Sequence, residues 1–368
     1  MVFQLPLLLP AAGAAAWAVT RFHLKGEDLS LYDVDQPVTF ETDPDSEGVR
    51  EVNAYLLENY VRPAKAASGS RADQLKARRA RMDNIGLTRE FPKEISFKPD
   101  TLVSGGVEIT GEWTRAKGAN PDRRLLYIHG GAGTVGSAIS HRGITSNLAL
   151  RTKASIFAVN YRLMPENPRM ASVQDVRAAY RWIIDNGPDG PATTERLAVA
   201  GDSAGGNLTL SLINWVRDTG LWPADAVIAI SPAVDSTFSS PSLRHNFKTD
   251  LMLQTLFQRF HKVPRTALLW GFWGLYRLSP SEPEISPIFA DLSGLPPTLV
   301  HVSSTEMLYD DARRYVAKAQ SQGSPATLQS WSYMPHVWHA FDRMLPEAGD
   351  AFDEIAAFLK SNNFMRKA

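Results

Sequence analysis

The sequence predicts an α/β protein in which a mostly parallel, eight-stranded sheet carries helices on both faces and a helical cap. Short β-rich runs appear from about residue 94 onwards, and helical stretches lie between most of the later ones. Strands that alternate with helices imply a parallel sheet covered on both faces. A Ser-Gly-Gly turn at 104–106 indicates an antiparallel hairpin at one edge. The interval 236–285 interrupts the alternation and is assigned to the cap.

Eight segments rich in β-forming residues are expected to make the sheet. They are 94–98, 107–113, 124–128, 154–160, 196–200, 226–230, 298–302 and 326–332. The intervening helices are expected at 172–185, 204–218, 309–322 and 347–360. An earlier helix is expected from Ser46 to Tyr60, because Val49, Val52 and Leu56 recur three and four residues apart.

The chain is expected to divide into a large α/β domain and a smaller cap, since 368 residues exceed one minimal domain. Residues 1–93 are assigned to an N-terminal arm and cap helices, and residues 94–368 to the α/β domain. The insertion at about 236–285 holds a helix-like run from Leu251 to His261 and an aromatic piece from Trp270 to Tyr276. Ligands of open α/β sheets bind beyond the carboxyl ends of the strands, so we expect the cap to lie there.

The amino-acid composition argues against several classes of protein and of site. Lys+Arg and Asp+Glu balance at 39 each, which gives no reason to expect a nucleic acid partner. The chain has no cysteine, which excludes disulfides, thiolate metal sites and a cysteine nucleophile. The one basic cluster, from Lys76 to Arg81, is interpreted as a solvated helix face.

Residues 2–20 are uncharged and mostly apolar. A secretory signal would carry a basic residue near its start, whereas the first basic residue here is Arg21. A membrane-spanning helix needs about 20 strongly apolar residues, and this segment contains two prolines. We therefore favour a hydrophobic arm that packs on the body or on a second subunit of a homodimer, and we expect a cytoplasmic protein. The alternative is export or membrane attachment through these residues.

Gly201-Asp-Ser203-Ala-Gly205 matches the G-x-S-x-G pattern of a nucleophilic serine. The pattern alone is weak, but a buried-strand run, 196–200, precedes it and a helical run from Asn207 to Val216 follows it. A serine on a sharp strand-to-helix turn needs small neighbours, because its backbone is strained and closely approached. Ser203 is therefore the predicted nucleophile, and a plain glycine turn is the alternative.

A glycine-rich loop begins at His129, directly after the strand at 124–128. Backbone N–H groups in such a loop can point into a site without obstruction by side chains. We expect the N–H groups of Gly130 and Gly131, together with that of Ala204, to form an oxyanion hole. His129 itself is interpreted as a structural hydrogen-bonding residue at the start of the loop.

The same loop has a rival interpretation as a nucleotide-binding turn, because Gly131 to Gly136 fits G-x-G-x-x-G. A dinucleotide site also needs an acidic residue about 20 positions further on, and the first one here is Glu166. A P-loop fails as well, because Ser137 stands where its lysine should be. No nucleotide cofactor is expected.

A nucleophilic serine needs a base, and the base needs an orienting acid. In hydrolases with this strand–turn–helix motif the acid and then the histidine follow the serine in the chain. Glu306 comes just after the strand at 298–302 and is the preferred acid, whereas Asp310 and Asp311 are expected to open the next helix. His336 lies closer than His339 to the end of the last strand and is the preferred base.

With these residues identified, the chain resembles the hormone-sensitive-lipase-like, or bacterial family IV, carboxylesterases of the α/β-hydrolase superfamily over roughly residues 94–360. The resemblance rests on an ordered set of motifs. They are His129-Gly-Gly, Tyr161-Arg-Leu with Pro165-Glu166, Gly201-Asp-Ser-Ala-Gly-Gly-Asn207, Ser231-Pro with Asp235, Ser286-Pro287, Gly294-Leu-Pro-Pro297, Glu306-Met-Leu with Asp310-Asp-Ala312, and Met334-Pro-His336.

The resemblance implies an α/β-hydrolase fold, a Ser203–His336–Glu306 triad and hydrolysis of small-molecule esters with short acyl chains, with no cofactor and no metal. Two positions depart from the usual family pattern. Ala132 replaces the third glycine of the loop, and Glu306-Met-Leu replaces Asp-Pro-Leu, although one branch of the family carries Glu there. An amidase or lactonase with the same triad is the alternative activity, and a non-catalytic ligand receptor is a further, less favoured one.

Overall fold

A nine-stranded mixed sheet forms the centre of the computed structural model, which describes residues 13–34, 37–61 and 69–365. Its strands are β1 (Val38–Phe40), β2 (Ile95–Ser104), β3 (Val107–Ala116), β4 (Asn120–Ile128), β5 (Ala154–Val159), β8 (Arg196–Asp202), β9 (Ala226–Ile230), β10 (Thr298–Ser303) and β11 (Ala326–Trp331). In space they follow the order β1-β11-β10-β9-β8-β4-β5-β3-β2. β3 runs antiparallel to β2 and β5, and the other described pairings in this sheet are parallel.

The predicted α/β-hydrolase fold is confirmed, with one more strand than the sequence indicates. Each of the eight predicted segments overlaps a strand, and the turn at 104–106 does join the antiparallel hairpin β2–β3. The additional strand, β1, pairs with β11 in parallel. It has only three residues, two of them exposed, so no apolar pattern marks it in the sequence. A separate two-stranded ribbon joins β6 (Asn186–Gly187) and β7 (Gly190–Pro191).

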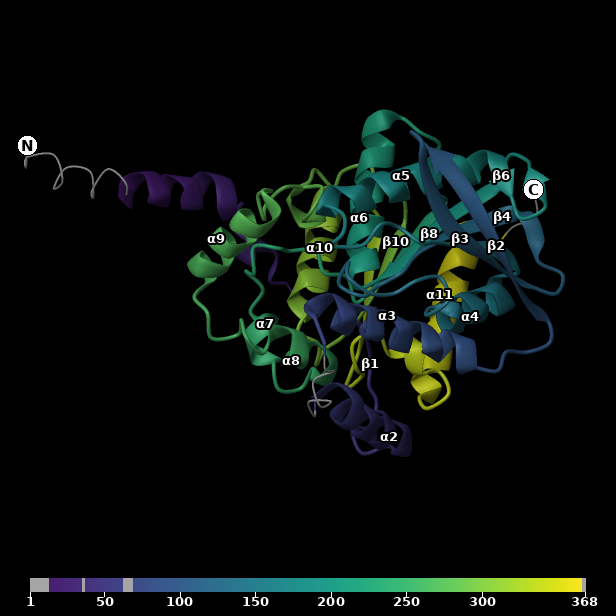
Figure 1. Ribbon diagram of the computed structural model, residues 1–368, viewed down its shortest axis with the longest axis horizontal. Helices are drawn as coiled ribbons and strands as arrows, with labels where there is room; N and C mark the ends of the chain where they lie inside the picture. The colour runs from purple at the N-terminus through teal and green to yellow at the C-terminus, as the bar shows by residue number, and fades with distance from the viewer. Residues whose placement is uncertain (1–12, 35–36, 62–68, 366–368) are drawn as a thin grey trace, which may run out of the picture.

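Helices cover both faces of the sheet (Figure 1). One face packs on α5 (Arg169–Asp185), α6 (Ala204–Thr219) and α10 (Tyr309–Ser321), whose buried residues share a core with the sheet. The other face packs on α4 (Arg142–Thr152) and α11 (Pro346–Ser361). Most residues of the inner strands are buried, and β5, β9 and β10 are buried at every residue, as expected of parallel strands covered on both sides.

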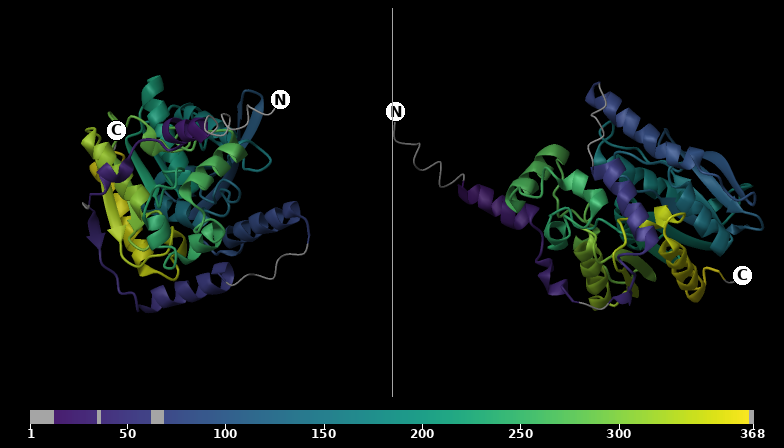
Figure 2. Two further views of the ribbon diagram at one scale, coloured as in Figure 1. Left: turned by 90° about the vertical axis from the view of Figure 1, so that its left-hand side faces the viewer. Right: turned by 90° about the horizontal axis from the view of Figure 1, so that it is seen from below.

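Further helices lie around the sheet and its covering helices. They are η1 (Thr20–Leu24), η2 (Leu29–Tyr32), α2 (Glu47–Leu56), η3 (Leu57–Val61), α3 (Arg71–Thr88), α7 (Ser242–His245), α8 (Leu251–Phe257), α9 (Arg265–Tyr276), η4 (Pro287–Phe289) and η5 (Trp338–Phe341). The N-terminal helix, which is described from residue 13 and continues into η1, lies beside α9 at the end of the molecule away from the C-terminus (Figure 2). That residues 1–93 and 236–285 work together as a cap stays a prediction.

Helix α3 packs on the glycine-rich loop that follows β4. A Cβ on Gly86 would lie 1.8 Å from the carbonyl oxygen of Ile139, so the helix and the chain approach each other closely. Arg79 donates from Nε to the carbonyl of Thr134 at 2.8 Å and forms a bidentate ion pair with Glu166 at 2.9 Å. Arg79 therefore holds α3 against the loop. The interpretation of the basic cluster from Lys76 to Arg81 as a solvated helix face is wrong for this residue.

The structure tests the predicted N-terminal arm only in part. Residues 2–12 of that segment lie outside the described residues. Within the described part of the chain, none of the helices combines the length and the apolar character needed to cross a membrane.

Candidate active site

Five parallel strands, β4, β8, β9, β10 and β11, end at one edge of the sheet. The loops that follow them carry the residues that the sequence analysis selected, from the glycine-rich loop after β4 to the histidine after β11. Parallel strands bring their carboxyl ends together, so residues far apart in the chain meet at this edge.

Ser203 occupies a sharp turn between β8 and α6. Its backbone has φ 51° and ψ −117°, a strained conformation for a residue other than glycine. The turn requires a glycine at position 205, because the Cβ of any other residue at Gly205 would lie 2.0 Å from the carbonyl oxygen of Ile128. The turn presents Ser203 at the N-terminal end of α6, where backbone N–H groups lack helical partners.

The structure brings Ser203, His336 and Glu306 together in one hydrogen-bonded chain. Nε2 of His336 lies 2.9 Å from Oγ of Ser203, and Nδ1 of His336 lies 2.7 Å from Oε2 of Glu306. The His336 and Glu306 side chains are buried. This is the order and spacing of a nucleophile, a base and an orienting acid.

Ser231 supports the acid, and the motif analysis assigned it no role. Its Oγ donates to Oε1 of Glu306 at 2.8 Å, and the backbone N–H of Ser303 donates to the same oxygen at 2.8 Å. Both oxygens of the Glu306 carboxylate therefore have partners, which fixes its orientation toward His336. The only signal in the sequence was the position of Ser231 directly after a buried strand, in a Ser-Pro pair.

The electrostatic environment favours the protonated form of His336. Burial alone disfavours a charged ring, but the hydrogen bond and charge of Glu306, with the charges of Asp250 and Asp202, outweigh it and raise the pKa of His336 above its usual 6.5. A base that gains affinity for a proton in this way can accept one from a neighbouring hydroxyl.

His339 is held away from this chain of residues. It is fully buried in η5, and its Nε2 lies 3.0 Å from Nδ1 of His301. Burial and the neighbouring His301 lower the pKa of His339 well below its usual value. The structure therefore brings His336, and not His339, to Ser203.

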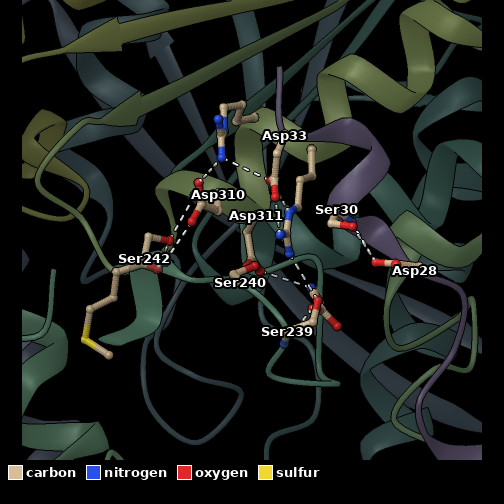
Figure 3. Close-up of polar contacts among 12 residues, drawn as sticks. Asp28, Ser30, Asp33, Ser239, Ser240, Ser242, Asp310 and Asp311 are labelled. Carbon is tan, nitrogen blue, oxygen red and sulfur yellow. Dashed lines mark hydrogen bonds and ion pairs between the residues drawn. The ribbon is translucent and has the colours of Figure 1, made fainter. Parts of the chain in front are cut away.

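Asp310 and Asp311 lie in the first turn of α10, where they contact the inserted segment (Figure 3). Oδ2 of Asp310 accepts the backbone N–H of Ser242 at 2.7 Å, and Asp311 accepts the hydroxyl of Ser240. Asp310 also pairs with Arg313 at 2.7 Å. These carboxylates join the helix to the insertion and do not reach His336.

Side chains of the insertion hold the turn that carries Glu306. They donate to four consecutive carbonyl oxygens, those of residues 304–307. Asn246 donates to the carbonyls of Ser304 at 2.9 Å and Glu306 at 2.7 Å. Thr249 donates to the carbonyl of Thr305 at 2.9 Å, and Ser242 donates to the carbonyl of Met307 at 2.8 Å. The position of the acid thus depends on a segment about 60 residues away in the chain.

Asp250 is a second buried carboxylate beside the acid and the base. It caps α8 by accepting the N–H of Leu253 at 2.8 Å, and it accepts the N–H of Met307 at 3.0 Å. Burial, with the charge of Glu306, raises its pKa to about 6, although the charge of His336 acts in the opposite direction. Ligand atoms of Asp250, Glu306 and His336 lie within 4.8 Å of one another. Each of these atoms already has a hydrogen-bond partner, so we assign no metal to them.

The structure corrects the sequence prediction at Gly130. Its N–H donates to Oδ1 of Asp202 at 3.0 Å and is therefore not free to bind an oxyanion. The same oxygen accepts the hydroxyl of Tyr127 at 2.6 Å, and His141 lies 3.5 Å away. A motif shows that a glycine is present, but only the structure shows where its N–H points.

The N–H groups of Gly131, Ala132 and Ala204 have no hydrogen-bond partner within the described ranges. Ala132 and Ala204 line a cavity of about 170 Å³ beside Ser203. His129 has the structural place that we expected, since its Nδ1 contacts the carbonyl of Gly130 at 2.7 Å and burial lowers its pKa to about 3. Donors available to an oxyanion therefore come from both sides of the serine.

The aromatic piece of the insertion forms α9, and two of its rings reach the cavity. Phe272 and Tyr276 line it, together with apolar side chains such as Met164. Trp270 instead donates to Oγ1 of Thr20 at 2.9 Å, and Trp273 packs on Trp270 with ring centroids 5.3 Å apart. Phe272 and Tyr276 thus line the cavity, whereas Trp270 and Trp273 face the N-terminal helix.

Comparisons with known proteins identify the family of this chain. A family model described as α/β hydrolase fold matches residues 125–340. An acetyl-hydrolase of Streptomyces hygroscopicus is 37% identical over 269 residues, which cover 73% of this chain and 84% of that protein. An esterase of Acinetobacter venetianus is 32% identical over 279 residues, covering 75% and 86%. The crystal structure of an esterase from the bacterial hormone-sensitive lipase family is similar with a TM-score of 0.72 and 31% identity, covering 86% of this chain and 99% of that one.

Proposed function

This chain belongs to the hormone-sensitive-lipase-like carboxylesterases of the α/β-hydrolase superfamily, and we propose that Ser203, His336 and Glu306 form the triad with which it hydrolyses carboxylic esters. One observation carries the proposal. It is the hydrogen-bonded chain from Glu306 through both ring nitrogens of His336 to Oγ of Ser203.

In this mechanism Oγ of Ser203 attacks the ester carbonyl carbon while Nε2 of His336 takes the hydroxyl proton. Glu306 holds the ring in the correct tautomer and stabilises the imidazolium. The tetrahedral intermediate then expels the alcohol, which receives the proton from His336 and leaves an acyl group on Ser203. Water, activated by the same histidine, attacks the acyl-enzyme and releases the carboxylic acid.

The backbone N–H groups of Gly131, Ala132 and Ala204 are the proposed oxyanion donors. The lack of other partners for all three N–H groups, and the position of Ala132 and Ala204 in the cavity wall, support this assignment. Donors fixed before the reaction stabilise developing charge without reorganisation, and each is worth about 100- to 1000-fold in rate in comparable sites.

A short acyl chain is the proposed substrate preference. The cavity beside Ser203 is small, about 170 Å³, and the rings of Phe272 and Tyr276 bound it. Each methylene that fits contributes up to about 0.8 kcal/mol of binding, until the wall is reached and the trend reverses. We expect the highest kcat/KM at roughly two to six acyl carbons and a steep fall by about ten.

The test of the triad is Ser203→Ala, assayed with 4-nitrophenyl butyrate. Loss of the nucleophile should lower kcat by at least about 10⁴-fold, while the melting temperature stays within a few degrees. A fluorophosphonate should add to the wild-type protein and not to the variant, as read by intact mass. Ser304→Ala, which removes an exposed hydroxyl in the acid turn, is the matched control. Retention of more than about a tenth of the wild-type rate by Ser203→Ala would refute the proposal.

A further inference from the structure

A cationic side chain lines the substrate cavity. Arg169 is the first residue of α5, and it forms part of the wall together with Ala204 and Asn207. The rest of the wall near it is apolar, with Met164 and Leu208 among its residues. A guanidinium in an apolar cavity next to a nucleophile requires an explanation.

The contacts of Arg169 leave its charge uncompensated. Nη1 donates to Oγ of Ser172 at 2.6 Å, and Nη2 donates to Oδ1 of Asn207 at 2.7 Å. Both acceptors are neutral, and they use two of the five N–H donors of the guanidinium. Among the residues that the structure describes, no carboxylate forms an ion pair with Arg169.

Neighbouring arginines differ in this respect. Arg162, just before α5, pairs with Asp175 at 2.7 Å, and Arg177, two turns along the same helix, pairs with Glu284 at 2.6 Å. Within the described ranges, the arginines on either side of Arg169 therefore have counter-ions, whereas Arg169 itself has none.

Burial disfavours the charge on Arg169 and lowers its pKa, an effect that the phenol groups of Tyr161 and Tyr276 partly oppose. An arginine nevertheless stays protonated at physiological pH. Arg169 is half-buried. A charge that is partly withdrawn from water without an ionic partner is costly, and an anion that enters the cavity would reduce this cost.

We propose that Arg169 binds a carboxylate carried by the ester substrate, so that the preferred substrates are half-esters of dicarboxylic acids or esters of hydroxy acids. This inference rests on the proposed role of Ser203. Asn207, which holds the guanidinium, lies four residues after Ser203 and thus about 6 Å along α6. A short carbon chain between the ester and the carboxylate spans this separation and packs on the apolar wall. The free N–H donors of Arg169 match the two oxygens of a carboxylate.

The test compares anionic and neutral esters of the same shape in the wild-type enzyme and in Arg169→Met. Monoethyl glutarate against ethyl pentanoate places the carboxylate on the acyl side, and 4-acetoxybutanoate against butyl acetate places it on the alcohol side. The readout is the ratio of kcat/KM for the anionic ester to that for the neutral one. In one of the two pairs the wild-type ratio should exceed one, and Arg169→Met should lower it by about tenfold or more, as expected for a charge-assisted contact.

Arg169→Lys keeps the charge but not the planar fork, and it should retain part of the preference. Arg177→Met, which removes a paired arginine from the same helix, should leave the ratio unchanged. If Arg169 serves only to join α5 to α6, Arg169→Met will lower both rates equally and leave the ratio as it was, which overturns the proposal. Ratios below one in both substrate pairs of the wild-type enzyme also overturn it.

Calorimetric titration of glutarate separates this proposal from that of the triad. Glutarate should bind the wild-type protein and Ser203→Ala with the same affinity, and Arg169→Met at least about tenfold more weakly. Activity that survives in Ser203→Ala would refute the triad and leave the binding result standing. Equal binding to wild type and Arg169→Met would refute the carboxylate site alone.

Discussion

Ser203 follows β8 and Glu306 follows β10, two strands that flank β9, but the chain around them is held by different means. Around Ser203 the backbone itself sets the geometry. Gly205 packs its α-carbon against the carbonyl of Ile128, with no room for a side chain. Around Glu306 the turn depends on side chains of the insertion, such as Asn246, which donate to its carbonyl oxygens.

This difference indicates which changes each half of the site tolerates. An added side-chain atom disrupts a turn whose backbone is closely packed. Loss of a hydrogen bond from a segment distant in the chain displaces a turn only gradually. A side chain added at the closely packed Gly205 should therefore mainly lower the stability of the protein. Loss of a hydrogen bond to the turn that carries Glu306 should mainly lower kcat.

The largest effect is expected at the acid itself. Glu306→Gln should lower kcat by about 10³- to 10⁴-fold, because a neutral amide cannot stabilise the imidazolium and favours the wrong tautomer of His336. Asp310→Asn is the matched control, since that carboxylate contacts Ser242 and Arg313 and not the base. Steady-state kinetics and melting temperatures of both variants check the assignment. A greater loss of kcat in Asp310→Asn at equal stability would reverse it.

Gly205→Ala tests the close backbone packing around Ser203. The new methyl group would lie 2.0 Å from a backbone oxygen that cannot move away, which costs about 3 kcal/mol or more. We expect a lower melting temperature and little active protein. Gly274→Ala in α9 adds the same atom where nothing lies within 4 Å, and it should stabilise its helix by about 0.5–1 kcal/mol. Equal melting temperatures for the two variants would show that the contact at Gly205 does not matter.

The same contrast explains what the sequence could predict. The strand, the turn and the helix around Ser203 are local, so the pattern of glycines and apolar residues was sufficient to identify them. The contacts of Ser231, Asn246 and Asp250 with the acid turn join segments 50 or more residues apart, and no spacing rule connects them. The prediction for Gly130 was wrong for a related reason, since the direction of its N–H depends on Asp202.

Asn246→Ala tests whether the insertion positions the acid. The variant loses two hydrogen bonds, to the carbonyls of Ser304 and Glu306, each worth about 1 kcal/mol. We expect kcat to fall by about tenfold while KM changes by less than about threefold, because the acid moves but the cavity does not. Asn59→Ala, which removes one hydrogen bond from an exposed helix, is the control. An unchanged kcat at full stability would show that the turn holds Glu306 without help.

The smallest expected effect is a shift in the pH profile of kcat/KM. This shift distinguishes the effect of the position of Glu306 from the effect of the charge of Asp250. Only neutral His336 can accept the proton of Ser203, so kcat/KM should fall as the pH drops through the pKa of this ring. The charges of Glu306, Asp250 and Asp202 raise that pKa above 6.5, so the midpoint should lie above 6.5. Asp250→Asn removes one of these charges and should move the midpoint down by less than about one pH unit. Asn246→Ala removes no charge, so it should lower kcat and move the midpoint less than Asp250→Asn does. If both variants shift the midpoint equally, the position of the acid turn, rather than the charge of Asp250, sets the affinity of His336 for its proton.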